Sequence, residues 1–253
     1  MKQKSLHFIL LFWALSASLS NAQSRKGIDY NAFNLHISYG AHLPGGDLSN
    51  RFGPFFSVGG GAEFLLHNGN WILGAESYLQ FGGNVRESAM LDNLFSREGE
   101  IIGNDGTFAS VVLRQRGMYT GVVLGKLFPI SASNKKSGIR FTVGGGYWWH
   151  KIRIQDDYES ASQLFGDYKK GYDRLTGGVA IQEFIGYQHL DKNRMLNFIA
   201  GFEFGQGFTK SIRDWNFDTM SAPTASRIDI SIGVRITWIL PFYIGMPSED
   251  IYY

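Results

Sequence analysis

The chain of 253 residues contains no cysteine, which excludes disulfide bonds as a source of stability. After Gln23 it has no run of about 18 apolar residues, so the sequence predicts no transmembrane helix. An excess of charge is missing as well. The first 22 residues hold two of the 24 basic residues and no acidic residue, which leaves 22 of each sign in the rest. This balance gives no indication of a nucleic-acid partner.

The first 22 residues have the pattern of a secretory signal peptide. Lys2 and Lys4 precede the apolar run 8–15, and small residues at 20–22 suit a signal peptidase. We expect cleavage before Gln23 and an N-terminal periplasmic segment over 23–32. Without cysteine, the exported protein must hold itself together by another route.

Glycine is abundant, with 32 residues, and apolar and polar residues alternate along most of the chain. Over 226–240, SRIDISIGVRITWIL, one set is apolar throughout, whereas the other carries Asp229 and Arg235. A period of two is typical of a β-strand with two different faces. The same alternation predicts eight strands, around 33–43, 56–66, 71–81, 114–127, 139–149, 175–181, 196–208 and 228–240.

The connections between these strands alternate in length. Those at 67–70, 129–138 and 190–194 are short, whereas 44–54, 84–109, 157–173 and 211–225 are longer. Short periplasmic turns and long outer loops are typical of an antiparallel meander through an outer membrane. The fold class predicted is therefore all-β, an eight-stranded antiparallel up-and-down transmembrane β-barrel with long extracellular loops.

The orientation of the apolar face separates this barrel from a soluble sandwich or a lipocalin-type barrel, in which that face would point inward. The polar face is rich in Gly, Ser and Thr, small residues that fit a narrow lumen, and its charges balance in sign. The apolar face carries aromatic residues near strand ends, with Trp71 and Trp238 near the inner interface and Tyr147 and Trp149 near the outer one. Such girdles favour an apolar face that contacts lipid.

In these features the chain resembles small eight-stranded outer-membrane β-barrel proteins of the Bacteroidota type. The resemblance is one of architecture, and it implies location in the cell outer membrane with lipid as a partner. We expect the barrel over 33–240 and a C-terminal tail over 241–253. The alternative is that the tail extends the last strand despite Pro241.

The charged residues of the polar face are expected to form one network in the lumen. Glu63 and Glu76 flank the 67–70 turn, with Lys126 and Arg140 approaching from the next hairpin. The predicted network comprises Glu63, Glu76, Arg114, Arg116, Lys126, Arg140, Glu203, Asp229 and Arg235, with Glu203 and Arg235 as a candidate pair. Two interpretations stay open: a plug of paired buried charges or a gated ion path.

Three residues outside this network are candidate contacts for a protein partner. Glu183 falls on the apolar face, so either a β-bulge turns it inward or a partner covers it. In the loop 84–109, Leu94 and Phe95 belong to an apolar set at helical spacing, which predicts a short helix over the barrel mouth or a docking element.

Motifs for catalysis, cofactors or metals are not recognisable in the sequence. The histidines lack metal-ligand spacing, and His36 and His42 are expected to point inward with Ser38. The leading hypothesis is a non-enzymatic structural or accessory subunit of an envelope assembly or secretion machine. A narrow channel or carrier for a small hydrophobic ligand is the alternative, followed by a lipid-modifying enzyme.

Overall fold

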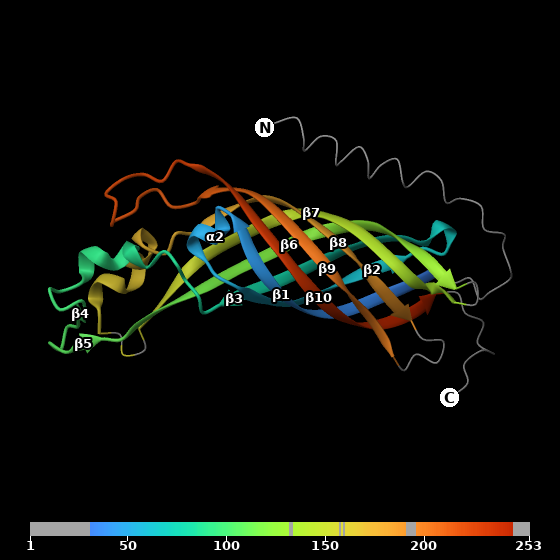
Figure 1. The fold of residues 1–253 in the computed structure, drawn as a ribbon, viewed down its shortest axis with the longest axis horizontal. Coiled ribbons are helices and arrows are strands. Elements are labelled where there is room, and N and C mark those ends of the chain that lie inside the picture. The colour runs from blue at the N-terminus through green and yellow to red at the C-terminus, as the bar shows by residue number, and fades with distance from the viewer. Residues whose placement is uncertain (1–30, 132–133, 157, 159, 191–195, 245–253) are drawn as a thin grey trace.

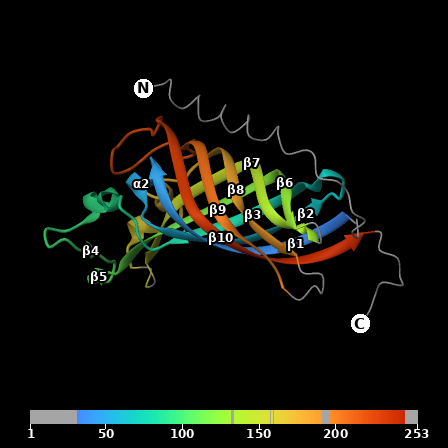
Figure 2. The same ribbon diagram turned by 45° about the vertical axis from the view of Figure 1, so that its right-hand side comes forward.

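The computed structural model describes residues 31–131, 134–156, 158, 160–190 and 196–244. Their dominant feature is a closed sheet of eight antiparallel strands, in the order β1-β10-β9-β8-β7-β6-β3-β2. The strands are β1 (Asn31–Gly46), β2 (Phe55–Leu65), β3 (Trp71–Gly82), β6 (Val111–Ser131), β7 (Asn134–Asp156), β8 (Thr176–Leu190), β9 (Asn197–Ser211) and β10 (Ser226–Ile244). β1 and β10 lie side by side and close the barrel (Figures 1 and 2). The predicted eight-stranded antiparallel barrel is confirmed.

The alternation of each strand decides which side chains face the interior. In β10, Ser231 is 5% exposed, whereas its neighbour Ile232 is 54% exposed, and the alternation continues along the strand. The apolar set thus forms the outer wall, and the polar set faces inward. An apolar wall around a polar interior is the arrangement of a barrel that crosses a membrane. Closure pairs the strand edges, which replaces the missing disulfides as the means of holding the sheet together.

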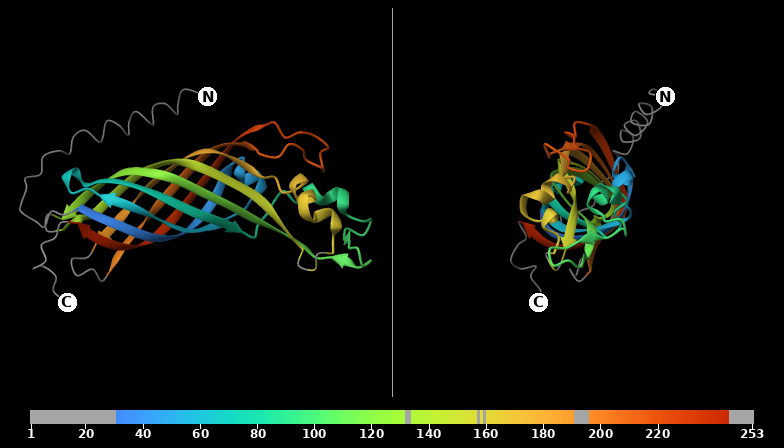
Figure 3. Two further views of the ribbon diagram at one scale, coloured as in Figure 1. Left: turned by 180° about the vertical axis from the view of Figure 1, so that it is seen from behind. Right: turned by 90° about the vertical axis from the view of Figure 1, so that its left-hand side faces the viewer.

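Short turns join the strands at one end of the barrel, called here the turn end, and longer connections join them at the other, the loop end. The loops hold α2 (Leu48–Arg51), the 3-10 helices η2 (Ser88–Leu94), η3 (Ser162–Leu164) and η4 (Gly166–Gly171), and a hairpin of β4 (Ile101–Ile102) and β5 (Phe108–Ala109). These segments gather over the mouth of the barrel (Figure 3). At the turn end, η1 (Asn68–Asn70) forms the tight turn predicted at 67–70.

None of the helices in the described ranges is long and apolar enough to cross a bilayer.

The ends of the barrel differ from those expected. β10 continues past Leu240 to Ile244, and Pro241 pairs with Asn34. Pairing of β10 with β9 ends at Trp238. Pro241 therefore has a strand on one side only, where a missing N–H donor is tolerated.

The barrel expected over 33–240 is too short at both ends, since β1 begins at Asn31. The expected signal peptide, the segment 23–30 and the tail 245–253 lie outside the described residues.

Two apolar clusters fill the interior near its ends. The turn-end cluster consists of Ala32, Leu65, Ile72, Leu127, Phe184, Leu190, Ile199 and Ile239. The loop-end cluster joins interior side chains to the loops and includes Leu48, Phe52, Phe55, Tyr78, Met90, Leu91, Tyr119, Trp148, Ile152, Leu164 and Tyr172. Both clusters are buried, and the polar side chains of the interior lie between and among them.

Candidate functional site

An ion pair crosses the bore just above the turn-end cluster. Arg140 Nη1 on β7 donates to Glu63 Oε1 on β2 at 2.8 Å, and the two side chains are 3% and 1% exposed. Asn34 Nδ2 donates to the same carboxylate oxygen at 3.0 Å, and Gln188 Oε1 accepts from Arg140 Nη1 at 3.0 Å. These further hydrogen bonds offset part of the desolvation cost of burying the pair.

Arg235 on β10 is the centre of a second group. Its Nη1 lies 2.8 Å from Glu203 Oε2 and 3.5 Å from Glu76 Oε2, and it donates to the Tyr78 hydroxyl at 2.6 Å. Tyr78 in turn donates to Glu76 Oε2 at 2.7 Å. The guanidinium carbon lies 4.6 Å from the ring centroid of Phe184. One cation therefore contacts two carboxylates in the interior of the barrel.

A third group lies closer to the loop end, around Asp229. His150 Nε2 is 2.9 Å from Asp229 Oδ2, Thr209 donates its hydroxyl to the same oxygen, and Arg227 Nη2 donates to Oδ1 at 3.2 Å. His150 and Asp229 are fully buried. The carboxylate thus has a partner on each oxygen, as a buried charge requires.

Ser57, His42 and Glu203 lie in a row inside the barrel, an arrangement that the sequence did not reveal. His42 Nε2 is 2.8 Å from Ser57 Oγ, and His42 Nδ1 is 3.9 Å from Glu203 Oε1. Ser–His–carboxylate rows are used in nucleophilic catalysis. Here, however, the ring of Phe55 stacks on His42 with centroids 5.1 Å apart, and Glu203 is paired with Arg235. The row is packed within the polar interior, which favours a structural role.

Six of the nine predicted lumen charges occupy these interior groups. They are Glu63, Glu76, Arg140, Glu203, Asp229 and Arg235, and each is at most 6% exposed. The candidate pair Glu203–Arg235 forms an ion pair. Glu63 and Glu76 lie on adjacent strands, as expected, but they contact different arginines: Glu63 pairs with Arg140, and Glu76 shares Arg235 with Glu203.

The other three predicted lumen charges lie on the outer wall, and their assignment to the lumen is corrected here. Arg114 is exposed, Arg116 is half-buried, and Lys126 lies over the outward ring of Trp71 at 5.2 Å. Both alternating sets of β6 contain apolar or small residues, so the sequence pattern does not define its phase. The strand pairing defines the phase. Tyr119 lies opposite Tyr78 and Trp148, and all three side chains are buried, so the even-numbered residues of β6 face outward.

For Glu183, the structure excludes the first of the two expected explanations, the β-bulge. Its register is continuous, with Val143 on one side and Phe204 on the other, so no bulge turns it inward. The side chain is exposed on the apolar outer wall, near the middle of β8. It makes no hydrogen bond or ion pair with any residue that the structure describes. A carboxylate in this position is costly in hydrocarbon unless something covers it.

The four predicted interface aromatics lie on the outer wall. Trp71, Tyr147 and Trp238 are exposed, and Trp149 is half-buried. Trp71 begins β3, and Trp238 pairs with Phe198 near the start of β9, so both are at the turn end. Tyr147 and Trp149 pair with the first residues of β8, at the loop end. Two levels of aromatic side chains thus border the apolar wall.

Salt bridges tie the loops together into a lid over the barrel mouth. Glu87 accepts from Arg51 Nε and from Arg174 Nε, both at 2.7 Å, and Arg174 Nη1 donates to Asp218 Oδ1 at 2.8 Å. Partial burial by itself raises the pKa of Glu87, but Arg51 and Arg174 outweigh it and hold that pKa below its usual range. At Asp218, burial by itself also raises the pKa, but the hydrogen bond and the charge of Arg174 outweigh it, so this pKa is lowered too. Four separate loops therefore meet in one network.

The apolar residues of the loop 84–109 contribute to the same lid. Met90 and Leu91 are buried in the loop-end cluster, and Leu94 packs against it. Phe95 is 42% exposed. The predicted short helix is a 3-10 helix, and most of its apolar face packs over the mouth of the barrel, whereas Phe95 remains partly exposed.

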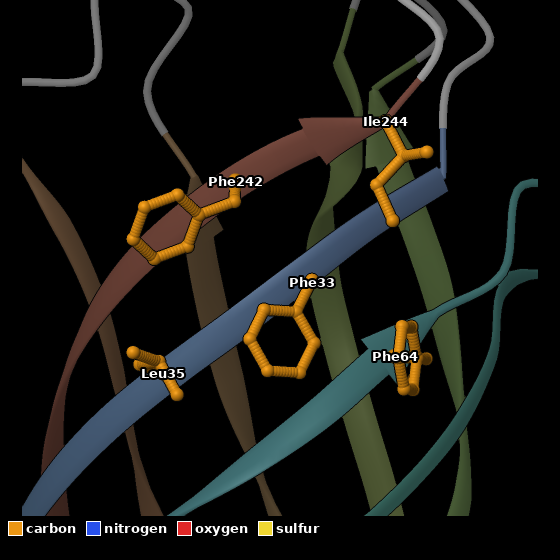
Figure 4. Close-up of a pocket in the computed structure, with 5 residues that line it drawn as sticks. All are labelled: Phe33, Leu35, Phe64, Phe242 and Ile244. Atoms are coloured by element: carbon orange, nitrogen blue, oxygen red, sulfur yellow. The ribbon is translucent and has the colours of Figure 1, made fainter.

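A shallow apolar groove lies on the outer wall at the turn end. Phe33, Leu35, Phe64, Phe242 and Ile244 line it, and all five side chains come from the outward face of β1, β2 and β10 (Figure 4). The groove is therefore part of the apolar wall rather than of the interior. Within the described ranges, no three histidine, aspartate or glutamate side chains are grouped as a metal site would need.

No protein-family model matches the sequence, and no curated protein matches it significantly. Among solved structures, the attachment invasion locus protein Ail of Yersinia pestis is similar at 9% identity, with a TM-score of 0.39 over 84% of this chain and 100% of Ail. The outer-membrane protein OprG of Pseudomonas aeruginosa is similar at 9% identity and a TM-score of 0.39, over 85% and 98%. A mutant of the monoaromatic hydrocarbon channel TodX scores 0.29 at 10% identity, over 86% and 68%. At these values the matches indicate no function for this chain.

The sequence missed the uncharged partners of the buried charges, namely Asn34, Tyr78, Gln188 and Thr209. All four lie on the inward set of their strands, but only Asn34 and Tyr78 fall within the strands predicted from the alternation, since Gln188 and Thr209 lie beyond the ends expected for β8 and β9. The sequence does not show which of these side chains contacts which charge, because the contacts join strands that are far apart in the chain.

Proposed function

We propose that the protein is a non-conducting outer-membrane barrel that serves as a structural or accessory subunit of an envelope assembly or secretion machine. One observation carries this proposal: paired charges occupy the bore between an apolar cluster at each end. Eight strands enclose an interior just wide enough for side chains to fill. A bore filled in this way leaves the outer wall and the lid as the surfaces through which the protein acts.

The outer wall supports the accessory role, because Glu183 lies among apolar residues and has no partner among the residues that the structure describes. Its cross-strand neighbours Val143 and Phe204 are both outward and apolar. A transmembrane segment of another protein that offers a hydrogen-bond donor or a cation would remove the cost of this carboxylate. Phe95, exposed on the lid, is a second candidate contact, outside the membrane.

The alternative functions have less support in the described residues. A channel or carrier for a hydrophobic ligand would need an apolar cavity inside the barrel, whereas the groove of Figure 4 lies on the outer wall. A lipid-modifying enzyme would need a nucleophile that faces lipid, whereas Ser57 is 3% exposed inside the barrel.

Two experiments test the proposal. In planar bilayers, the purified protein should show no ion conductance, with a 16-stranded porin as the conducting control; stable single channels would contradict a closed bore. For the accessory role, the tagged protein should retain a partner when it is purified from outer membranes. Glu183→Leu should lose that partner, and Ile37→Leu, on a distant part of the outer wall, should keep it. Retention by both variants would contradict a role for Glu183.

A further inference from the structure

Four basic side chains form a cluster on the outer wall of the two longest strands. Arg114 and Arg116 lie on β6, and Lys151 and Arg153 lie on β7, with Arg114 paired to Arg153 and Arg116 to Lys151 in the ladder. β6 has 21 residues and β7 has 23. A transmembrane strand needs only about 9–11 residues. These strands therefore extend beyond the rest of the sheet at the loop end (Figure 3). The basic cluster lies on that extension, because its residue pairs are in the part of the ladder close to Val111 and Asp156.

The positive charge of this cluster is largely uncompensated. Directly paired residues have Cβ atoms about 5 Å apart, and like charges at that distance destabilise a sheet. Within the described ranges, the one ion pair made by any of the four joins Lys151 Nζ to Asp173 Oδ2, at 4.0 Å. Asp173 already accepts from Arg213 with both oxygens, at 2.8 and 2.6 Å. The sequence therefore places four cations together where the described residues supply one shared carboxylate.

The cluster is adjacent to the loop-end aromatic level. The next outward pair towards the turn end is Met118 with Trp149, and Arg116 pairs with Phe81 on its other side. Aromatic girdles lie where hydrocarbon meets headgroups. Cations one residue pair beyond the girdle lie at the depth of lipid phosphates.

We propose that Arg114, Arg116, Lys151 and Arg153 bind the phosphate of an outer-leaflet lipid headgroup. Guanidinium groups match phosphate oxygens through paired hydrogen bonds, and the anion would relieve the repulsion between the four cations. The apolar wall below, with Met118 and Val122 outward on β6, would contact the acyl chains. That contact favours a lipid over a free anion. This inference rests on the membrane placement proposed above.

The test measures lipid binding to the detergent-purified barrel by native mass spectrometry. The probes are phosphatidic acid, which has an exposed phosphate, and phosphatidylcholine. The wild type should retain phosphatidic acid preferentially. The double variant Arg114→Gln/Arg153→Gln should lose roughly 10- to 30-fold in affinity for it, because each cation near a lipid surface contributes about fivefold. Arg114→Lys/Arg153→Lys, which keeps both charges, should retain most of the binding.

The matched control is Arg97→Gln/Lys170→Gln, which removes two exposed loop cations and should leave the affinity unchanged within about twofold. Equal losses in both double variants would overturn the site, as would full competition by inorganic phosphate, which would show a soluble-anion site instead. A heat-dependent shift on unheated gels reports separately on the barrel. If the shift is normal and phosphatidic acid is not preferred, the lipid site fails while the proposed barrel stands.

Discussion

Arg140 on β7 and Glu63 on β2 meet across the bore, 77 positions apart in the chain, with Nη1 and Oε1 separated by 2.8 Å. Two other strands, β6 and β3, separate β7 from β2 along the shorter way around the barrel. The contact therefore exists only because the sheet is closed, and it links opposite walls of the barrel.

We expect Arg140→Ala to lower the free energy of unfolding by about 3–5 kcal/mol, because Glu63 would be left buried without its cation. Adding Glu63→Gln should restore part of that loss. Denaturant unfolding in detergent micelles measures both effects. Arg114→Ala is the control, since this outward side chain should change stability by no more than about 0.5 kcal/mol. Equal effects of Arg140→Ala and Arg114→Ala would contradict the buried pair.

The two faces of β10 give a test of membrane insertion. Ile232→Arg should cost roughly 2–4 kcal/mol in a lipid bilayer if the residue lies near the midplane, whereas Ile232→Val should be nearly neutral. Reversible unfolding from phosphatidylcholine vesicles measures both. If Ile232→Arg is tolerated and Ile232→Val destabilises the protein, the apolar face would instead be the core of a soluble barrel.

Acid should loosen the lid. The pKa values of Glu87 and Asp218 are lowered by folding, so their ion pairs contribute fully above the pKa values of the unfolded chain and are lost as pH falls through the lower folded values. Hydrogen exchange over 212–225 should therefore become faster below about pH 4, relative to intrinsic rates.

Arg174 pairs with both Glu87 and Asp218, so substituting it tests whether this network causes the acid response. Arg174→Ala should leave the segment 212–225 already loose at neutral pH and remove most of its acid dependence. Lys170→Ala, which breaks only the exposed pair with Asp167, should behave as the wild type. An acid response that persists unchanged in Arg174→Ala would contradict the role of the network.

The number of strands, the alternation of short and long connections and the two faces of β10 could all be predicted from the sequence. Each depends on local information: a period of two separates faces, and breaks in that period mark the connections. The link expected at 129–138 is mostly strand, since β6 runs to Ser131 and β7 begins at Asn134. The interior position of Glu63, Arg140 and Arg235 follows from the same alternation. Where both alternating sets are apolar or small, as in β6, the period carries no phase, and Arg114, Arg116 and Lys126 were assigned to the wrong face.

Only the tertiary structure decided which charged residues form ion pairs and which have no partner among the described residues. Strand tilt and stagger determine which residues lie opposite each other across the bore, and they are properties of the whole closed sheet rather than of any one strand. The continuous ladder on both sides of Glu183 excluded the bulge that a local pattern allowed. The sequence by itself thus determined a closed barrel with an apolar wall. Closure of the sheet decided that Arg140 reaches Glu63, and the pairing of β6 with β7 decided that four cations face outward together.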